Sequence, residues 1–323
     1  MIDIVFYDAN FGWGPTYNAT HPVGGWEVYQ TQMATWFAAS GLRVVALQRG
    51  GSETVGGVEY IDTREFGRER LFKTYVARVC ITGRHSALPT YIGADSVFTS
   101  VVDDPRFCDE TYDHLKGRST LVCISDWQRG LYQALGHDAV TIRSCLDDDI
   151  YEWKRPEWAE GFVCVNAWNK GTEATLAMWR QMKAKHTSWK ATLRVGSPYS
   201  HPADAAERCS AAGASWIGTL SPRQVVTTLA SAEAVFRVNA WHPETFGVCD
   251  AIAEAVGTRV HCLFTGEVGA SPEAIVSPYL TTHIAGFQDG VLFPNKPYPR
   301  AKDWRVSTIM PQWLKLLGLG GAS

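Results

Sequence analysis

The segment AWHPETFGVCDAIAEAVGTRV at 240–260 carries side chains suited to binding a sugar. Glu244 lies between an expected strand and an expected helix, and Phe246 and Gly247 follow it closely. A carboxylate there can accept hydrogen bonds from sugar hydroxyls, while backbone amides from Phe246 onward can meet phosphate oxygens. The alternative is that Glu244 is a helix N-terminal carboxylate stabilised by the helix dipole. Taken alone, the segment favours this second interpretation.

Lys170 and Gly171 form a second junction of the same kind. They follow an expected strand at 161–167 and open an expected helix at 171–186. A lysine beside free helix amides is well placed to hold a diphosphate. A surface lysine that binds nothing fits the same pattern equally well.

Gly24 and Gly25 separate a long aromatic loop, NFGWGPTYNATHPV, from the start of a helix. Glycines at such a point let the backbone approach a ligand, and the helix amides favour an anion. An isolated pair is more often a tight turn. The pattern G-x-G-x-x-G does not follow the first strand and no Walker A sequence is present, which disfavours an NAD enzyme and a P-loop protein.

Composition predicts an ordinary folded protein. Of 323 residues, 46% are hydrophobic and 20% are charged, with 30 Lys and Arg against 33 Asp and Glu. These values exclude disordered, collagen-like and coiled-coil classes. Neither a signal peptide nor a transmembrane segment is expected. The eight cysteines contain no C-x-x-C pair, so we expect reduced thiols, no metal site and a cytoplasmic location.

The net charge of the chain is −3, but basic residues are concentrated in a run at 64–84. They are Arg64, Arg68, Arg70, Lys73, Arg78 and Arg84. Such a run can meet an anionic acceptor such as a phosphorylated glycan, a lipid headgroup or DNA. A solvated helix face explains it as well and is the favoured interpretation.

Short apolar runs alternate with amphipathic helices along the whole chain. Expected strands include 2–9, 43–47, 76–82, 95–102 and 120–125, and the rhythm restarts at 161–167 after a polar stretch at 147–161. This alternation predicts two parallel sheets covered by helices, hence two Rossmann-like domains. We expect a first domain at 1–155, a second at 156–302 and a terminal helix at 303–323 that crosses back to the first.

Six segments in this order resemble the retaining GT-B glycosyltransferases often called GT4. They are GGWEVYQTQMATWFAASGLRVVAL, CISDWQRGLYQALG, IRSCLDDDIYEW, FVCVNAWNKGTEATLAMW, ETFGVCDAIAEAVGTRV and KDWRVSTIMPQWLKLLG. The resemblance covers almost the full length. It implies an α/β chain of GT-B architecture, with two facing Rossmann-like domains and a donor cleft.

The resemblance also implies roles for individual residues. Glu244 would position the donor sugar, and His85 and Asp103 would contact the sugar or the acceptor hydroxyl. Base contacts would come from Gly196, Thr219 and Leu220. The diphosphate would be held by groups at three junctions, namely Gly24, Gly25, Lys170, Gly171, Phe246 and Gly247.

The chain departs from the family pattern at two positions. Ile252 stands where the family has a ribose-binding glutamate, and Glu254 lies two residues later, about 200° around an ideal helix. Glu254 could take the role through a shifted helix start. Val165 replaces an arginine that often precedes the lysine, so Arg194 or Arg223 could contribute instead.

The resemblance implies transfer of a sugar from a nucleotide diphosphate sugar to a hydroxyl of a glycan or small molecule, with retention and without a metal. A UDP-sugar is the first expectation for the donor and a GDP-sugar the second; no oligomeric state is predicted. Three alternatives stay open. They are a phage-type DNA glycosyltransferase acting on hydroxymethylated bases, a nucleotide-sugar epimerase on the same fold, and a binding module without activity.

Overall fold

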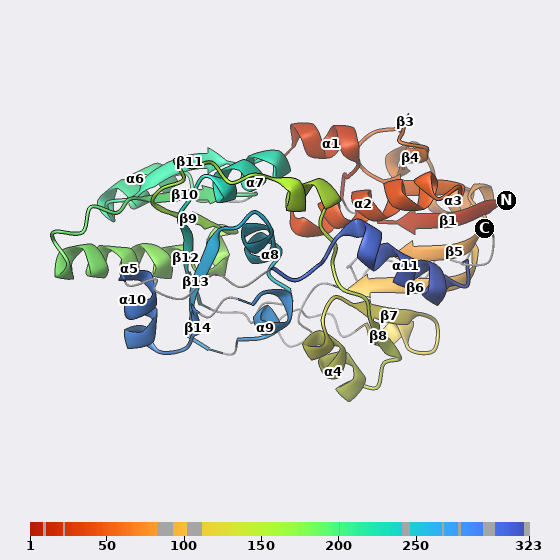
Figure 1. Cartoon of the computed structure of the whole chain (residues 1–323). Coiled ribbons are helices and arrows are strands. Elements are labelled where there is room, and N and C mark those ends of the chain that lie inside the picture. Colours follow the sequence, from red (N-terminus) through yellow and green to blue (C-terminus); the bar gives the residue numbers. More distant parts are fainter. Residues whose placement is uncertain are drawn as a thin grey trace. The chain divides into compact units, whose positions relative to one another are not determined.

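The computed structural model describes residues 1–8, 11–21, 23–82, 93–101, 112–199, 201–240, 246–266, 268–276, 279–292 and 301–319. By its internal contacts the chain divides into two compact units (Figure 1). The first unit contains Met1–His21, Gly25–Asp147 and Trp304–Ser323, and the second contains Pro22–Gly24 and Asp148–Asp303. Both chain ends therefore belong to the first unit.

The first unit is built on an eight-stranded sheet in the order β3-β4-β2-β1-β5-β6-β7-β8. Every neighbouring pair in it is parallel except β3 and β4. The strands are β1 (Ile2–Tyr7), β2 (Val44–Gln48), β3 (Glu53–Val55), β4 (Val58–Asp62), β5 (Ala77–Thr82), β6 (Ala94–Val101), β7 (Thr120–Cys123) and β8 (Ala139–Thr141). β1 and β2 are almost wholly buried, as expected for central strands covered on both faces.

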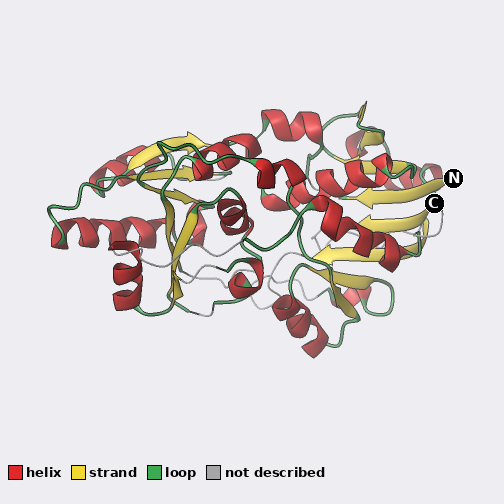
Figure 2. Cartoon of the chain, viewed as in Figure 1, coloured by secondary structure: helices red, strands yellow, loops and turns green. Residues whose placement is uncertain are grey.

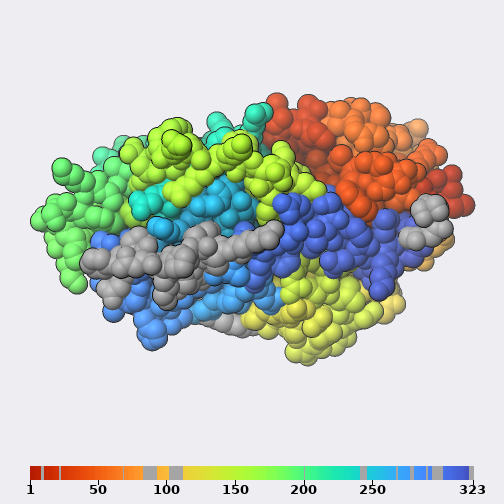
Figure 3. All heavy atoms as spheres, in the orientation of Figure 1, coloured from red at the N-terminus to blue at the C-terminus, as the bar shows by residue number. Residues whose placement is uncertain are grey.

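Helices pack on this sheet (Figure 2). They are α1 (Pro15–Thr20), α2 (Gly25–Ala39), α3 (Arg68–Thr74), α4 (Asp126–Ala134) and α11 (Val306–Leu317). Met33, Ala34 and Phe37 of α2 are buried, and they recur at the three- and four-residue spacing that makes one helix face. α11 packs on α2, where Trp313 Nε1 donates a hydrogen bond of 3.0 Å to the hydroxyl of Tyr29. In Figure 3 the blue C-terminal segment accordingly lies against orange atoms of the first unit.

The second unit contains a six-stranded sheet in the order β11-β10-β9-β12-β13-β14. All of its neighbouring pairs are parallel. The strands are β9 (Phe162–Val165), β10 (Leu193–Ser197), β11 (Ser215–Thr219), β12 (Ala234–Asn239), β13 (Arg259–Phe264) and β14 (Tyr279–Thr281). In chain order this is 3-2-1-4-5-6, the doubly wound order of dinucleotide-binding folds, whose direction of winding reverses between β9 and β12.

The helices of this unit are α5 (Thr172–Lys185), α6 (Ala205–Ala211), α7 (Pro222–Ala230), α8 (Val248–Ala255), α9 (Ser271–Ala274) and α10 (Ile284–Leu292). The core on one face of the sheet joins Trp179 of α5, Phe236 of β12 and Phe287 of α10. Trp179 and Phe236 meet edge to face, with ring centroids 5.3 Å apart. No helix of the described chain is long and apolar enough to cross a membrane.

The predicted α/β class with two parallel-rich sheets is confirmed. The sequence analysis missed the β3–β4 ribbon, two short first-unit helices (α1 and α3), and α9, β14 and α10 near the end of the second sheet. β3 and β14 have only three residues each, too few for an apolar alternation to stand out.

Candidate functional site

The strand order of the second sheet reverses its direction between β9 and β12. The paired residues of the two strands are Phe162 with Ala234 and Val163 with Val235, all in the amino-terminal halves. In open α/β sheets, ligands bind in the crevice outside the carboxyl ends at this switch point. The segments that follow β9 and β12 are therefore the natural candidates for a ligand site.

Gly171 is the N-cap of α5 and follows a short 3-10 turn, Trp168–Lys170, after β9. Its φ of +104° lies in the region that favours glycine, and a Cβ there would be 2.2 Å from the carbonyl oxygen of Val238. Only glycine lets the turn approach β12 this closely. No described side chain caps α5, so its first amides have none of the usual side-chain acceptors.

Two side chains fix this junction. Thr175 Oγ1 donates to the carbonyl of Gly171 at 2.9 Å and accepts from the amide of Val238 at 2.9 Å. Asn166 Nδ2 donates to the carbonyl of Lys170 at 3.0 Å. Lys170 thus stands on a backbone turn held at both ends, beside the α5 amides. The sequence analysis missed Thr175, because its partner strand lies 63 residues away.

α8 starts in the same manner after β12. Its N-cap is Gly247, with φ 79° and ψ 55°, and no side chain in the described ranges caps it. Phe246 is buried and anchors the approach to the helix. Asp250, in the first turn, forms an ion pair with Arg237 of β12 in which both side chains are only 3% exposed. The pair holds the start of α8 against the strand.

Two other helices, α4 and α7, start with a side-chain cap, whereas α1, α3, α6, α9 and α11 have none among the described residues. Ser125 caps α4, and Ser221 forms a capping box with Gln224 at α7. α5 and α8, which flank the switch point, begin instead at left-handed glycines without a side-chain cap. Together with Lys170, their amides make this edge of the sheet suited to an anion with several oxygens, such as a diphosphate.

The structure brings Gly196, Thr219 and Leu220 together at the carboxyl ends of β10 and β11. The Leu220 amide donates to the carbonyl of Ser197 at 2.8 Å, and a Cβ on Gly196 would lie 2.7 Å from Leu220 Cδ1. His201 Nε2 lies 3.0 Å from Thr219 Oγ1. These residues therefore line the same edge of the second sheet as Lys170.

Glu254 lies away from that edge. α8 begins at Val248, so Glu254 stands in its last turn, about 9 Å along the helix axis by the usual rise. Its carboxylate is buried and Oε2 accepts a hydrogen bond of 2.8 Å from the amide of Val276. Glu254 thus contacts the chain that leads from α9 to β14.

Three predicted catalytic residues, Glu244, His85 and Asp103, lie outside the described residues. Gly25 is the first residue of α2 and Gly24 precedes it. Trp13, in the aromatic loop before α1, is buried edge-on between Phe6 and Tyr60, so its ring face is not open to a sugar.

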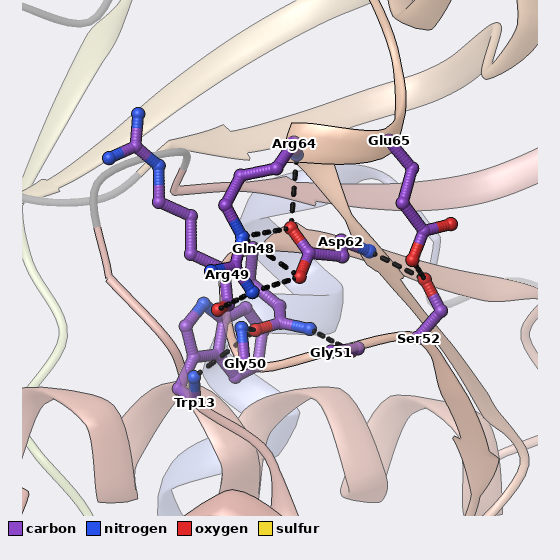
Figure 4. A network of polar contacts seen from close by, with 9 residues as sticks. All are labelled: Trp13, Gln48, Arg49, Gly50, Gly51, Ser52, Asp62, Arg64 and Glu65. Carbon is purple, nitrogen blue, oxygen red and sulfur yellow. Dashed lines mark hydrogen bonds and ion pairs between the residues drawn. The ribbon is translucent and has the colours of Figure 1, made fainter.

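Figure 4 shows a polar network at the carboxyl ends of β2 and β4 in the first unit. Gln48 accepts from the amides of Gly50 and Trp13 and donates to the carbonyl of Gly51 at 2.7 Å. Asp62 accepts three side-chain hydrogen bonds from Arg64, which lower the pKa of its carboxyl. The network fixes the loop after β2, while the Arg49 side chain points away from it.

Three residues of the basic run, Arg64, Arg70 and Arg78, contact other side chains of the first unit. Arg64 is bound to Asp62, Arg70 lies 5.2 Å from the ring centre of Phe66, and Arg78 is 3.6 Å from Asp3. Lys73 lines a cavity of about 890 Å³ with Glu69, Phe72, Val76, Gly93, Ala94 and Asp95. This cavity lies at the amino ends of β5 and β6, opposite the edge where such sheets bind ligands.

No family model matches the chain, and no curated protein matches it by sequence. Solved structures do match. HepE from Anabaena, solved in complex with UDP and glucose, superposes with a TM-score of 0.71 at 14% identity, over 98% of this chain and 100% of HepE. This chain has a GT-B glycosyltransferase fold.

Two further structures support the assignment of the fold. A glycosyltransferase from Rickettsia africae matches with a TM-score of 0.68 at 10% identity, over 99% of each chain. A trehalose 6-phosphate synthase from Burkholderia multivorans matches with a TM-score of 0.66 at 9% identity, over 98% of this chain and 96% of that one. The GT-B resemblance identified from the sequence is confirmed at the level of the fold.

Proposed function

We propose that the chain is a glycosyltransferase that moves a sugar from a nucleoside diphosphate sugar to an acceptor hydroxyl. The observation that carries this proposal is the switch point of the second sheet. There, Lys170 and two helix starts without side-chain caps follow β9 and β12, at the sheet edge where such folds bind ligands. The structure of HepE, of the same fold, holds UDP and glucose.

The chemistry requires stabilisation of a leaving diphosphate. The Lys170 ammonium and the amides of α5 and α8 supply positive charge and hydrogen bonds that strengthen as the glycosidic bond breaks. Gly24 and Gly25 let the backbone approach the same group, and Glu244 orients the donor sugar. In this proposal no divalent metal is needed, transfer retains the anomeric configuration, and UDP is the expected carrier.

The acceptor is proposed to be a glycan or a small molecule held by the first domain, at 1–155. His85 and Asp103 would orient its hydroxyl, and the helix at 303–323 would complete this domain. DNA is less favoured as the acceptor, because Arg64 and Arg78 already contact carboxylates within the chain. An epimerase would give an isomerised sugar without an acceptor.

The proposal is tested by incubating the full chain with UDP-, GDP-, ADP- and TDP-sugars. Release of one nucleoside diphosphate is expected, and Lys170→Ala should slow it about 100-fold because a charge on the leaving group is lost. Lys185→Ala, at the exposed far end of α5, is the matched control and should keep the wild-type rate. Absence of release with every donor, or an isomerised sugar as sole product, would contradict the proposal.

A further inference from the structure

Asn239 is a buried polar residue at the end of an apolar strand. It is the last residue of β12 and is 4% exposed. Its backbone carbonyl accepts hydrogen bonds from the amide and the hydroxyl of Thr265, at 3.1 Å and 3.3 Å. Its side-chain nitrogen Nδ2, by contrast, has no hydrogen-bond partner among the residues that the structure describes. A buried N–H group without an acceptor lowers stability, so such a group calls for an explanation.

The alternation of β12 places Asn239 on the face that α8 covers. Phe236 and Val238 belong to the core shared with α5, on one face of the strand. Arg237 points to the other face, where it pairs with Asp250 of α8. Asn239 follows two residues later on that same face, nearer the carboxyl end of the sheet. It therefore lies at the level of the uncapped start of α8.

Hydrogen-bond donors dominate this corner of the sheet. Asn239 Nδ2, the first amides of α8 and the first amides of α5 all donate. The carboxylate in the first turn of α8, that of Asp250, is bound to Arg237. A ligand group that meets mostly donors must mainly accept, which fits a phosphate oxygen better than a sugar hydroxyl or a base edge.

We propose that the Asn239 side chain donates a hydrogen bond to a phosphate oxygen of the nucleoside diphosphate donor. The inference rests on the proposed function and adds a binding residue to it. Asn239 holds the diphosphate from the β12 side, across from Lys170 and the start of α5. The carboxamide suits this role because it is neutral, so it can be buried without the cost of an isolated charge.

Calorimetric titration of the full chain with UDP, GDP, ADP and inorganic pyrophosphate tests the inference. Asn239→Ala should weaken binding of pyrophosphate and of the preferred nucleoside diphosphate about tenfold. Asn239→Asp should weaken both further, because its carboxylate repels the phosphates. Asn239→Ser, which keeps a donor in a smaller side chain, should fall between wild type and Asn239→Ala.

The matched control is Thr258→Val. Thr258 is buried in the same unit just before the amino end of β13, where its hydroxyl donates to the carbonyl of Leu229 at 2.8 Å. Loss of this hydrogen bond in Thr258→Val should lower the melting temperature of the protein without changing its affinity for pyrophosphate.

Wild-type affinity in the Asn239 variants, or equal losses in the alanine and aspartate variants, would overturn the role of Asn239 alone. If the wild type binds none of the nucleoside diphosphates, the proposed function fails and the inference falls with it.

Discussion

The pKa values of two side chains, Asp62 and His261, are lowered by their surroundings. The hydrogen bonds and charge of Arg64 hold the pKa of the Asp62 carboxyl below its usual range. His261, in the middle of β13, lies in the core of the second sheet, and burial, together with the charge of Arg259, lowers its pKa to about 3. The imidazole therefore stays neutral in the folded chain across the physiological range.

His261 makes stability depend on pH. Below the ordinary pKa of about 6.5, His261 is protonated in the unfolded chain but stays neutral in the folded chain. The free energy of unfolding therefore decreases as the pH falls toward 3. From pH 6.5 to pH 5.0 the loss is about 2 kcal/mol. Urea denaturation at both pH values should show this loss in the wild type. His261→Gln should have a correspondingly flatter dependence, and an equal loss in both proteins would contradict the burial argument.

At the scale of elements, the site depends on how closely the start of α5 approaches β12. Gly171→Ala would place a Cβ 2.2 Å from a backbone oxygen and strain a left-handed residue. We expect it to destabilise the chain by more than about 3 kcal/mol. Gly213→Ala, at a φ of +71° with nothing within 4 Å of the added Cβ, should cost only about 1 kcal/mol. Comparable urea midpoints for the two variants would show that the close approach does not matter.

The sequence predicted these elements better than their contacts. The expected strands at 43–47, 76–82 and 120–125 correspond to β2, β5 and β7, with ends that differ by one or two residues, because apolar runs are local signals. Gly171 and Gly247 were recognised as junctions for the same reason. The contacts of Thr175 and the place of Asn239 could not be predicted, since they depend on which strands are neighbours in the sheet. The same limit applies to Glu254, whose spacing in the sequence does not reveal that it contacts Val276.

At the scale of the whole molecule, the first unit contains both ends of the chain. Trp313 of α11 is fully buried and its indole nitrogen donates to Tyr29 of α2. Trp313→Ala should destabilise the first unit by roughly 3–5 kcal/mol, through the cavity and the lost hydrogen bond. Trp158→Ala, at a side chain that is 69% exposed, should change stability by less than about 0.5 kcal/mol. Equal urea midpoints for these two variants would show that α11 is not part of the first unit's core.

The central claim is that a nucleoside diphosphate binds where α5 and α8 begin. Hydrogen–deuterium exchange of the full chain, with and without UDP, GDP or ADP, tests it most directly, because the first amides of a helix lack intrahelical acceptors and exchange quickly unless a ligand accepts from them. The account predicts that the nucleotide that binds slows exchange at 172–174 and at 248–249, whose amides have no backbone acceptor among the described residues. Slowed exchange confined to other segments, with these two unchanged, would contradict it.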